Sequence, residues 1–517
     1  MRTRSNVFTL IANEHTDWPD ALVSYRKGVA AMRAYDPPDT DPATRPSDKR
    51  SWQYLAAVHG RAVDGESGPL DQSDPLWSQC QHGSWFFFPW HRMYLLTLES
   101  FIQHYSDDAG WSVPYWYAVD PDNPTSDVLP KAFLDPSGGN ALYIEERSTR
   151  ARTGQSVFGS TLLSLFGNEF IQNLGQPVFS VSARRPVHMF GLGGAEFKDP
   201  DFNHGKNGAI ESIPHGVTHN YVGTDYDPVT NQPIPPAGFM SDLETAARDP
   251  IFWLHHSNID RLWQMWLDLD PAHKNPDKDE WLNSSFTFPT PDGGTKKWLV
   301  GEVLDTTAPD LGYVYDTTVP PSKVGAAPRP RLQPREVSPQ VGAPIPAQPP
   351  QVIGATVGVP ILADRRADIT LSAPAVQSQA FTAGPELPVP RRWLLSLEGI
   401  TGTVAAPAYS VYVNLPSDAV AADHPDRMAG IITTFGVRDA SRPGGAHGGS
   451  GLTFVLDITG IHDGLDAAGQ WDPGNVSVAF VPLVPPAADE AAFAGRLAAA
   501  PPAAPDLRAA RIAVLVG

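Results

Sequence analysis

The chain has 517 residues, 41% hydrophobic and 18% charged, so it can bury a sizeable core and is not a disordered chain. Its 38 basic and 57 acidic residues give a net charge of −19 without a clustered basic stripe, which argues against a nucleic-acid partner. No apolar run approaches the roughly 18 residues that cross a bilayer, so we expect no membrane partner. Residues 7–12 are too short for a secretory core, and the expected location is the cytoplasm, with export by a partner chain left open.

Residues 1–316 contain four segments whose apolar side chains are spaced three and four apart, as on one face of a helix. In chain order, the four stripes begin at Leu22, Trp52, His91 and Phe252. Three of them include a histidine on the apolar face, and long loops rich in Gly, Pro and Asp separate them. This pattern predicts a helical bundle with inward-pointing histidines, a geometry that builds metal sites from facing helices.

The rest of the chain has a different composition. Residues 317–360 hold eleven prolines, which indicates an extended linker. In residues 361–517, short runs such as 410–414, 452–458 and 476–480 alternate with the period of half-buried strands. We therefore predict a mainly α protein with a core over 1–316, a Pro-rich linker over 317–360 and a β-rich, sandwich-like domain over 361–517.

Six histidines in two sets of three are the candidate metal ligands. The first set is His59, His82 and His91, and the second is His215, His219 and His256. His215 and His219 form an HxxxH pair, which on a helix puts both imidazoles on one face. Sets of imidazoles without carboxylates or thiolates suit copper better than magnesium, manganese or calcium. Two such sets among aromatic residues predict two copper ions and redox chemistry on dioxygen.

Residues beside these histidines are assigned as follows. His255 points about 100° away from His256 on a helix, so we assign it a structural role. Asp260, one turn after His256, is expected to orient a ligand imidazole by a hydrogen bond without binding the metal itself. Gly216 stands where a zinc protease of the HExxH type would carry its glutamate, so that class lacks its general base.

Four segments together resemble the type 3 copper family of tyrosinases, catechol oxidases and haemocyanins, over residues 50–316. They are residues 88–95 (FPWHRMYL), 113–116 (VPYW), 247–256 (ARDPIFWLHH) and 313–315 (YVY). The resemblance implies that the first histidine set holds one copper and the second set the other. It also implies a thioether bond between Cys80 and His82.

The activity that this resemblance implies is oxidation of ortho-diphenols to ortho-quinones with dioxygen, in some members with ortho-hydroxylation of monophenols. Glu211, four residues before His215, would orient a water that helps to deprotonate the phenol. Gly216 stands where good monophenol hydroxylases of the family often have Asn, so strong hydroxylation is not expected. Leu243 matches a gate position over the copper, and Gly216, Asn220 and Leu243 are the expected substrate-pocket residues.

Residues 361–517 resemble the carboxy-terminal domain of plant-type polyphenol oxidases, which covers the copper entrance and inserts a plug residue. We therefore expect a latent enzyme that becomes active when this domain is removed or displaced, with the Pro-rich linker as the cleavage site. The expected partners are dioxygen and a small phenol, and a homo-oligomer is compatible with the sequence. One alternative is a haemocyanin-like reversible oxygen carrier, and another is a binding protein with vestigial sites. Glu211 and the absence of tandem units favour the enzyme over the carrier, and the six intact histidines argue against vestigial sites.

Overall fold

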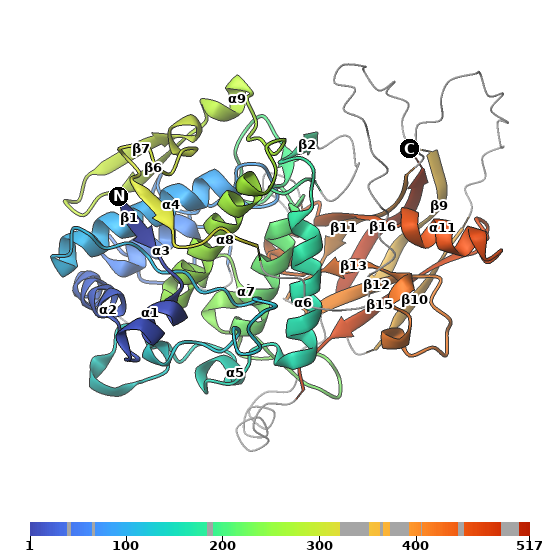
Figure 1. The fold of residues 1–517 in the computed structure, drawn as a ribbon, viewed down its shortest axis with the longest axis horizontal. Coiled ribbons are helices and arrows are strands. Elements are labelled where there is room, and N and C mark those ends of the chain that lie inside the picture. Colours follow the sequence, from blue (N-terminus) through green and yellow to red (C-terminus); the bar gives the residue numbers. More distant parts are fainter. Residues whose placement is uncertain are drawn as a thin grey trace.

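The structure is a computed structural model, and its first part is helical while its second part is rich in strands (Figure 1). It describes residues 1–38, 43–64, 68–182, 190–320, 351–361, 365–372, 392–404, 406–442, 449–486 and 506–516. The predicted fold class, a mainly helical core followed by a β-rich region, is confirmed. Most of the predicted linker lies outside the described residues, and strand β9 already begins at Gln351, before the predicted boundary at 361. The division into domains stays a prediction.

Each of the four predicted helical stripes lies on a helix with buried residues along the stripe. They are α2 (Asp20–Arg33), α3 (Trp52–His59), α4 (Phe87–Ser106) and α8 (Pro250–Leu269). Helix α4 packs against both α2 and α8. The other helices are α1 (Val7–Glu14), α5 (Thr149–Arg152), α6 (Gly159–Leu174), α7 (Val217–Gly223), α9 (Asp279–Leu282), α10 (Val437–Ala440) and α11 (Thr459–Ala467). Within the described residues, no helix combines the length and apolarity needed to cross a membrane.

Helix α8 forms the centre of the helical part. Its first turn is fixed by Asp249, whose side chain accepts a hydrogen bond from the Ile251 amide, and by Pro250 at the first helical position. Every residue from Pro250 to Trp263 is buried. A helix that is buried on all sides must be packed by other elements all round, so its side chains are held at fixed positions in the core.

The first and last strands of the helical part pair with each other. Strand β1 (Arg2–Arg4) pairs in parallel with β8 (Tyr313–Tyr315). The Arg4 guanidinium is fully buried and pairs with Glu99 on α4 and Asp260 on α8. Short strand pairs complete this part: β2 (Val181–Ser182) with β3 (Ala195–Glu196), β4 (Asp225–Tyr226) with β5 (Pro233–Ile234), and β6 (Ser285–Pro289) with β7 (Thr295–Leu299).

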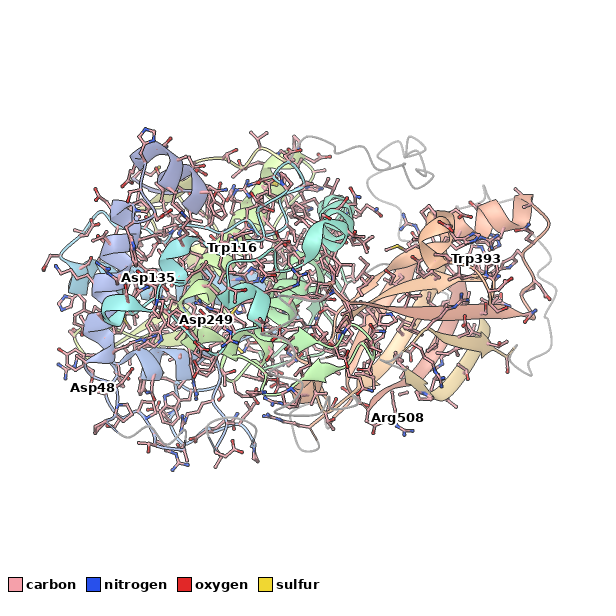
Figure 2. All side chains as sticks on the ribbon, turned by 90° about the horizontal axis from the view of Figure 1, so that it is seen from below. Asp48, Trp116, Asp135, Asp249, Trp393 and Arg508 are labelled. Atoms are coloured by element: carbon pink, nitrogen blue, oxygen red, sulfur yellow. The ribbon has the colours of Figure 1, made fainter. Side chains whose placement is uncertain are left out.

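The second part consists of two four-stranded antiparallel sheets, with strand orders β10-β15-β12-β13 and β14-β11-β16-β9. The strands are β9 (Gln351–Ile361), β10 (Ala367–Leu371), β11 (Trp393–Thr401), β12 (Ala408–Val413), β13 (Met428–Ile432), β14 (Leu452–Asp457), β15 (Val476–Leu483) and β16 (Leu507–Val516). Side chains of both sheets, such as Leu397 and Val411, share one apolar core. The strands expected over 410–414, 452–458 and 476–480 correspond to β12, β14 and β15. Figure 2 shows this part, with Trp393 and Arg508 labelled, against one side of the helical part.

Candidate metal centre

The first histidine cluster combines a helix end, a loop and a helix interior. His59 is the last residue of α3, His82 lies in the loop before α4, and His91 lies on α4. Their ring centroids are 5.3 to 5.6 Å apart. One ligand atom from each ring lies within 4.8 Å of the others. All three rings are buried, so the cluster has the spacing and surroundings of a metal site.

The second cluster comes from three elements. His215 lies in an irregular helical turn, Glu211–Gly216, directly before α7, which carries His219, and His256 comes from α8. The Nε2 atoms of His219 and His256 are 3.3 Å apart. His255 also lies in this cluster, with its ring 5.1 Å from that of His219. The structure therefore brings four histidines together here, one more than the sequence analysis assigned.

Backbone carbonyls fix the orientation of four of the six rings. The Nδ1 atoms of His59, His91 and His219 lie 2.8 Å from carbonyl oxygens, and that of His215 lies at 3.1 Å. A carbonyl only accepts hydrogen bonds, so each Nδ1 must carry the proton and each Nε2 keeps a free lone pair. The Nε2 atoms of His59, His82, His91 and His215 are buried without a hydrogen-bond partner. Buried lone pairs of this kind are suited to a metal ion.

The protonation state of the rings also fits a metal. Burial lowers the pKa of His59 to about 4 and holds the pKa values of the other five candidate ligands well below the ordinary range. Neutral imidazoles are the form that binds metal. An all-imidazole donor set favours copper over metals that prefer oxygen. The residues present therefore fit copper.

The two clusters adjoin each other. The rings of His91 and His256, one from each cluster, stack with centroids 4.3 Å apart and an interplanar angle of 14°. The Sγ atom of Cys80 lies 3.3 Å from Nδ1 of His82. Burial raises the pKa of the Cys80 thiol well above its usual value. This proximity suits the expected thioether, which stays a prediction.

Glu211 and Asp260 have different surroundings. Glu211 is buried, and its Oε1 accepts a hydrogen bond of 2.7 Å from the Gly83 amide, while Oε2 has no hydrogen-bond partner. Burial raises the pKa of Glu211 to about 8. The expectation that Asp260 orients an imidazole is wrong, because its hydrogen bonds go to two arginines and two tyrosines. These partners are Arg4, Arg92, Tyr313 and Tyr315.

Phe435, which the sequence analysis did not single out, covers the second cluster. It follows β13, and its ring stacks on that of His219 at 4.1 Å and 14°. Its ring also meets the His215 ring edge-on, with centroids 5.4 Å apart. Gly436, with a φ of 75°, turns the chain directly after it. A Phe-Gly turn is too common to identify this role from sequence alone.

The three expected pocket residues all lie beside the segment that carries Phe435. Asn220 is fully buried and donates hydrogen bonds towards Thr433 and Thr434. Gly216 faces Thr433. The Leu243 side chain lies against Gly436, and the Leu243 carbonyl accepts from His59. The pocket positions are therefore occupied by contacts with the β-rich part.

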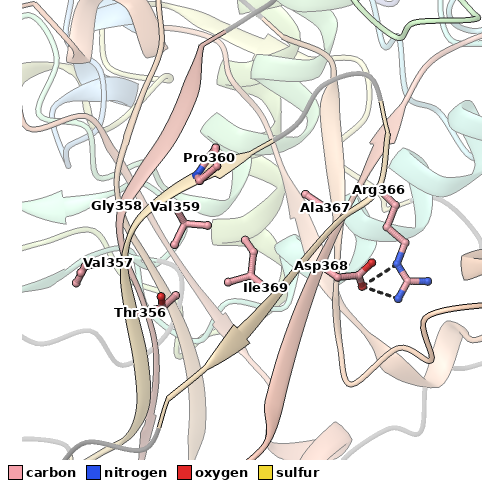
Figure 3. A pocket seen from close by; sticks show the side chains of 9 residues that line it. All are labelled: Thr356, Val357, Gly358, Val359, Pro360, Arg366, Ala367, Asp368 and Ile369. Carbon is pink, nitrogen blue, oxygen red and sulfur yellow. Dashed lines mark hydrogen bonds and ion pairs between the residues drawn. The ribbon is translucent and has the colours of Figure 1, made fainter.

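Figure 3 shows a shallow pocket elsewhere, between the edge strands β9 and β10. Its charged side chains, Arg366 and Asp368, pair with each other at 2.6 Å. Its lining contains no histidine. We therefore assign the chemistry to the histidine clusters and not to this pocket.

Comparisons with known proteins agree with this geometry. Residues 49–269 match the family model described as the common central domain of tyrosinase, and residues 349–499 match a domain of unknown function. The chain is 28% identical to tyrosinase HcTyr1 of Hahella sp. (strain CCB-MM4), over 93% of this chain and 95% of that protein. It is 30% identical to a chloroplastic polyphenol oxidase of Malus domestica, over 59% of this chain and 48% of that protein. The chain thus spans about half the length of the plant relative.

Solved structures share the fold of the chain. Latent apple tyrosinase has a TM-score of 0.58 at 22% identity, with 100% of this chain and 97% of that chain covered. Latent aurone synthase has a TM-score of 0.56 at 20% identity, covering 100% and 90%. The fold and the histidine site define a copper-dependent oxidoreductase. Over residues 49–269, the part that the family model matches, the chain belongs with the tyrosinases and polyphenol oxidases.

Proposed function

We propose that the chain oxidises ortho-diphenols to ortho-quinones with dioxygen at two copper ions. The observation that carries this proposal is the pair of adjoining, buried histidine clusters, in which the Nε2 atoms of four rings have no hydrogen-bond partner. His59, His82 and His91 would hold one ion, and His215, His219 and His256 the other. The relatives reported above are named as enzymes, which favours an oxidase over a haemocyanin-like oxygen carrier.

The chain itself would orient the imidazole ligands, exclude water from the site and supply a proton acceptor. When bound, copper supplies the redox chemistry: two diphenols together lose four electrons and four protons while one dioxygen becomes two waters. The carbonyl hydrogen bonds to Nδ1 hold the imidazoles in place, which lowers the cost of organising the site. Phe87 and Phe252 pack on the ligand rings and exclude water. Oε2 of Glu211 is free to take or give a proton through a water, and a nearby metal charge would lower the pKa of its carboxyl.

We further propose that the β-rich part keeps the enzyme latent, with Phe435 as the plug. Phe435 is only 4% exposed and fills the space beside His215 and His219. A phenolic ring needs the same stacking position against an imidazole. A substrate and Phe435 would therefore compete for one place.

Oxygen uptake by the copper-loaded full chain tests the activity, with catechol offered first and tyrosine second, before and after limited proteolysis. Uptake with catechol supports a catechol oxidase, and uptake with tyrosine as well makes the chain a tyrosinase. An optical change that reverses with oxygen, without net oxygen uptake, would overturn the proposal in favour of an oxygen carrier. Proteolysis that removes the β-rich part without raising activity would overturn latency.

Phe435→Ala tests the plug directly. Removing the ring opens the place beside His219, so we expect catechol oxidation by the unclipped chain to rise roughly tenfold or more. The clipped forms of the variant and the parent are the matched control and should have equal rates. An unclipped variant as inactive as the parent would show that Phe435 does not block the site.

A further inference from the structure

The residues that directly follow His215 and His219 meet the same short loop of the β-rich part, residues 433–435. The Asn220 Nδ2 atom lies 3.4 Å from the Thr433 hydroxyl and 3.3 Å from the Thr434 hydroxyl. A Cβ atom added to Gly216 would lie 2.6 Å from Cγ2 and 2.9 Å from Oγ1 of Thr433. Both distances are shorter than real Cβ contacts, so a side chain at 216 and the seated loop exclude each other.

The backbone does not explain the glycine at 216. Its φ of −64° and ψ of −34° are right-handed helical values that alanine adopts readily. An alanine here would be favoured by helix propensity. What requires a glycine at this position is therefore the space taken by Thr433.

Thr433 has little freedom to give way. It is 1% exposed, and its hydroxyl lies within hydrogen-bonding distance of the Asn220 amide and of the Phe435 backbone N–H, the latter at 3.4 Å. Its β-branched side chain has few χ1 rotamers. The next residue is also fixed, because the Thr434 hydroxyl donates to the Ala406 carbonyl at 2.6 Å. Relief of a clash at 216 must therefore move the loop and, with it, Phe435.

We propose that residue 216 is the docking contact that seats the loop: glycine there permits closure, and any side chain lifts Phe435 from the histidine clusters. This rests on the proposed function, in which Phe435 covers the substrate place. Gly216 then has a second role, in addition to its expected place in the substrate pocket. A side chain that adds substrate contacts at this position would at the same time remove the shield, so substrate selection and latency are coupled through one residue.

Hydrogen–deuterium exchange of the metal-free full chain tests the proposal without any activity measurement. The variants are Gly216→Ala, Thr433→Ala and the double variant, and the control is Gly464→Ala, where an added Cβ meets nothing within 4 Å. We expect Gly216→Ala to speed exchange of the Phe435 and Val437 amides by roughly five- to a hundredfold, the range that overpacking produces. Because Thr433→Ala removes both short contacts and leaves its Cβ at 3.3 Å, the double variant should return to within about twofold of Thr433→Ala alone.

Thr433→Ile tests the same contact from the loop side, with the helix unchanged, and should speed the same amides. Unchanged exchange in both Gly216→Ala and Thr433→Ile would overturn the proposal, as would a double variant that exchanges as fast as Gly216→Ala. Catechol oxidation by the copper-loaded, unclipped variants is the second readout and should follow the exchange rates. If no variant oxidises catechol even after clipping, the proposed function fails, while the exchange data still decide the role of residue 216.

Discussion

Each histidine in the clusters has two ring nitrogens, and the structure uses them differently. In His59, His91, His215 and His219, Nδ1 is held by a backbone carbonyl and Nε2 points to the site. His82 and His256 differ from these four: Nδ1 of His82 lies 3.3 Å from Sγ of Cys80, and Nδ1 of His256 is buried without a hydrogen-bond partner. The His256 ring is therefore held by packing, with His91 stacked on it and Phe252 tilted against it, and by the metal that it would bind.

The adjacent pair His255 and His256 allows a matched test at this scale. We expect His256→Gln to lower bound copper by about half, because one of two sets loses a ligand, while His255→Gln keeps it. Metal analysis of both purified variants, side by side with the parent chain, measures this. A larger loss of copper in His255→Gln than in His256→Gln would show that His255 is the ligand. Equal losses in the two variants would contradict the assignment of His256 alone.

At the scale of elements, α8 depends on its first turn. Asp249 caps the helix and also forms a two-pronged ion pair with Arg147, at 2.7 and 2.8 Å, with both side chains fully buried. Figure 2 labels Asp249 inside the helical part and Asp48 at its periphery. A buried pair of this kind fixes the position of the helix that carries His255 and His256.

Asp249→Ala should therefore destabilise the metal-free chain by about 3–5 kcal/mol, because it removes a helix cap and the buried carboxylate that compensates the charge of Arg147. Thermal or urea unfolding measures the loss. Asp48→Ala is the control, since Asp48 pairs with Arg50 at 2.7 Å on the surface, where such pairs contribute about 0–1 kcal/mol. A comparable loss in the two variants would mean that the buried pair has no special role.

At the scale of the whole molecule, an ion network beside the plug joins the two parts. Glu244 of the helical part is buried and pairs with Arg438 at 2.8 Å and with Arg442, both from the β-rich part. Arg438 also reaches Asp242 at 3.2 Å, and Arg442 reaches Asp439 at 3.3 Å. Three carboxyl groups thus face two guanidinium groups. The network has a balanced charge when one carboxyl group keeps its proton.

Two of the three carboxyl groups have a raised pKa, because burial raises the pKa of Asp242 to about 6 and that of Asp439 further. Asp439 is therefore the carboxyl group expected to hold a proton over the wider pH range. Burial, and the charge of Glu244, raise its pKa well above the usual value, whereas in Glu244 the arginines outweigh burial and lower the pKa. Opening the interface would return Asp439 to its ordinary pKa of about 3.9 and release the proton. The contribution of Asp439 to closure is therefore complete below that value and decreases as pH rises. Glu244 has the opposite effect on closure, but only at acidic pH, where protonation of its carboxylate would break its ion pairs with Arg438 and Arg442.

We expect alkaline conditions to favour the open form. Between pH 5 and 8, protection of the amides of residues 428–437, corrected for intrinsic exchange, should fall by at most about tenfold per pH unit. In Asp439→Asn, the neutral amide can donate to Glu244 at any pH, so the slope should flatten. Protection that rises with pH in the parent chain, or an identical slope in the variant, would exclude Asp439 as the cause.

Much of the helical part was predictable because its information is local. Apolar spacing of three and four placed α2, α3, α4 and α8, and six histidines in two sets indicated the metal centre. The helices are readable because the residues of a helix face recur at short intervals along the chain. The ligands are readable because several histidines lie on or next to those faces. The strands at 410–414 and 476–480 were found for the same reason, through their period of two.

What only the tertiary structure decided concerns contacts between distant segments. Asp260 lies one turn after His256, yet its carboxylate accepts hydrogen bonds from the buried Arg4 and Arg92, and Arg4 lies 256 residues before it. Phe435 and Thr433 meet His219 and Gly216 only because the β-rich part packs on the helical part. The sequence by itself indicated the family resemblance, four of the helices, three of the strands and the candidate ligands. The partner of a buried charge and the fit of one domain against another depend on three-dimensional packing, which leaves no periodic trace along the chain.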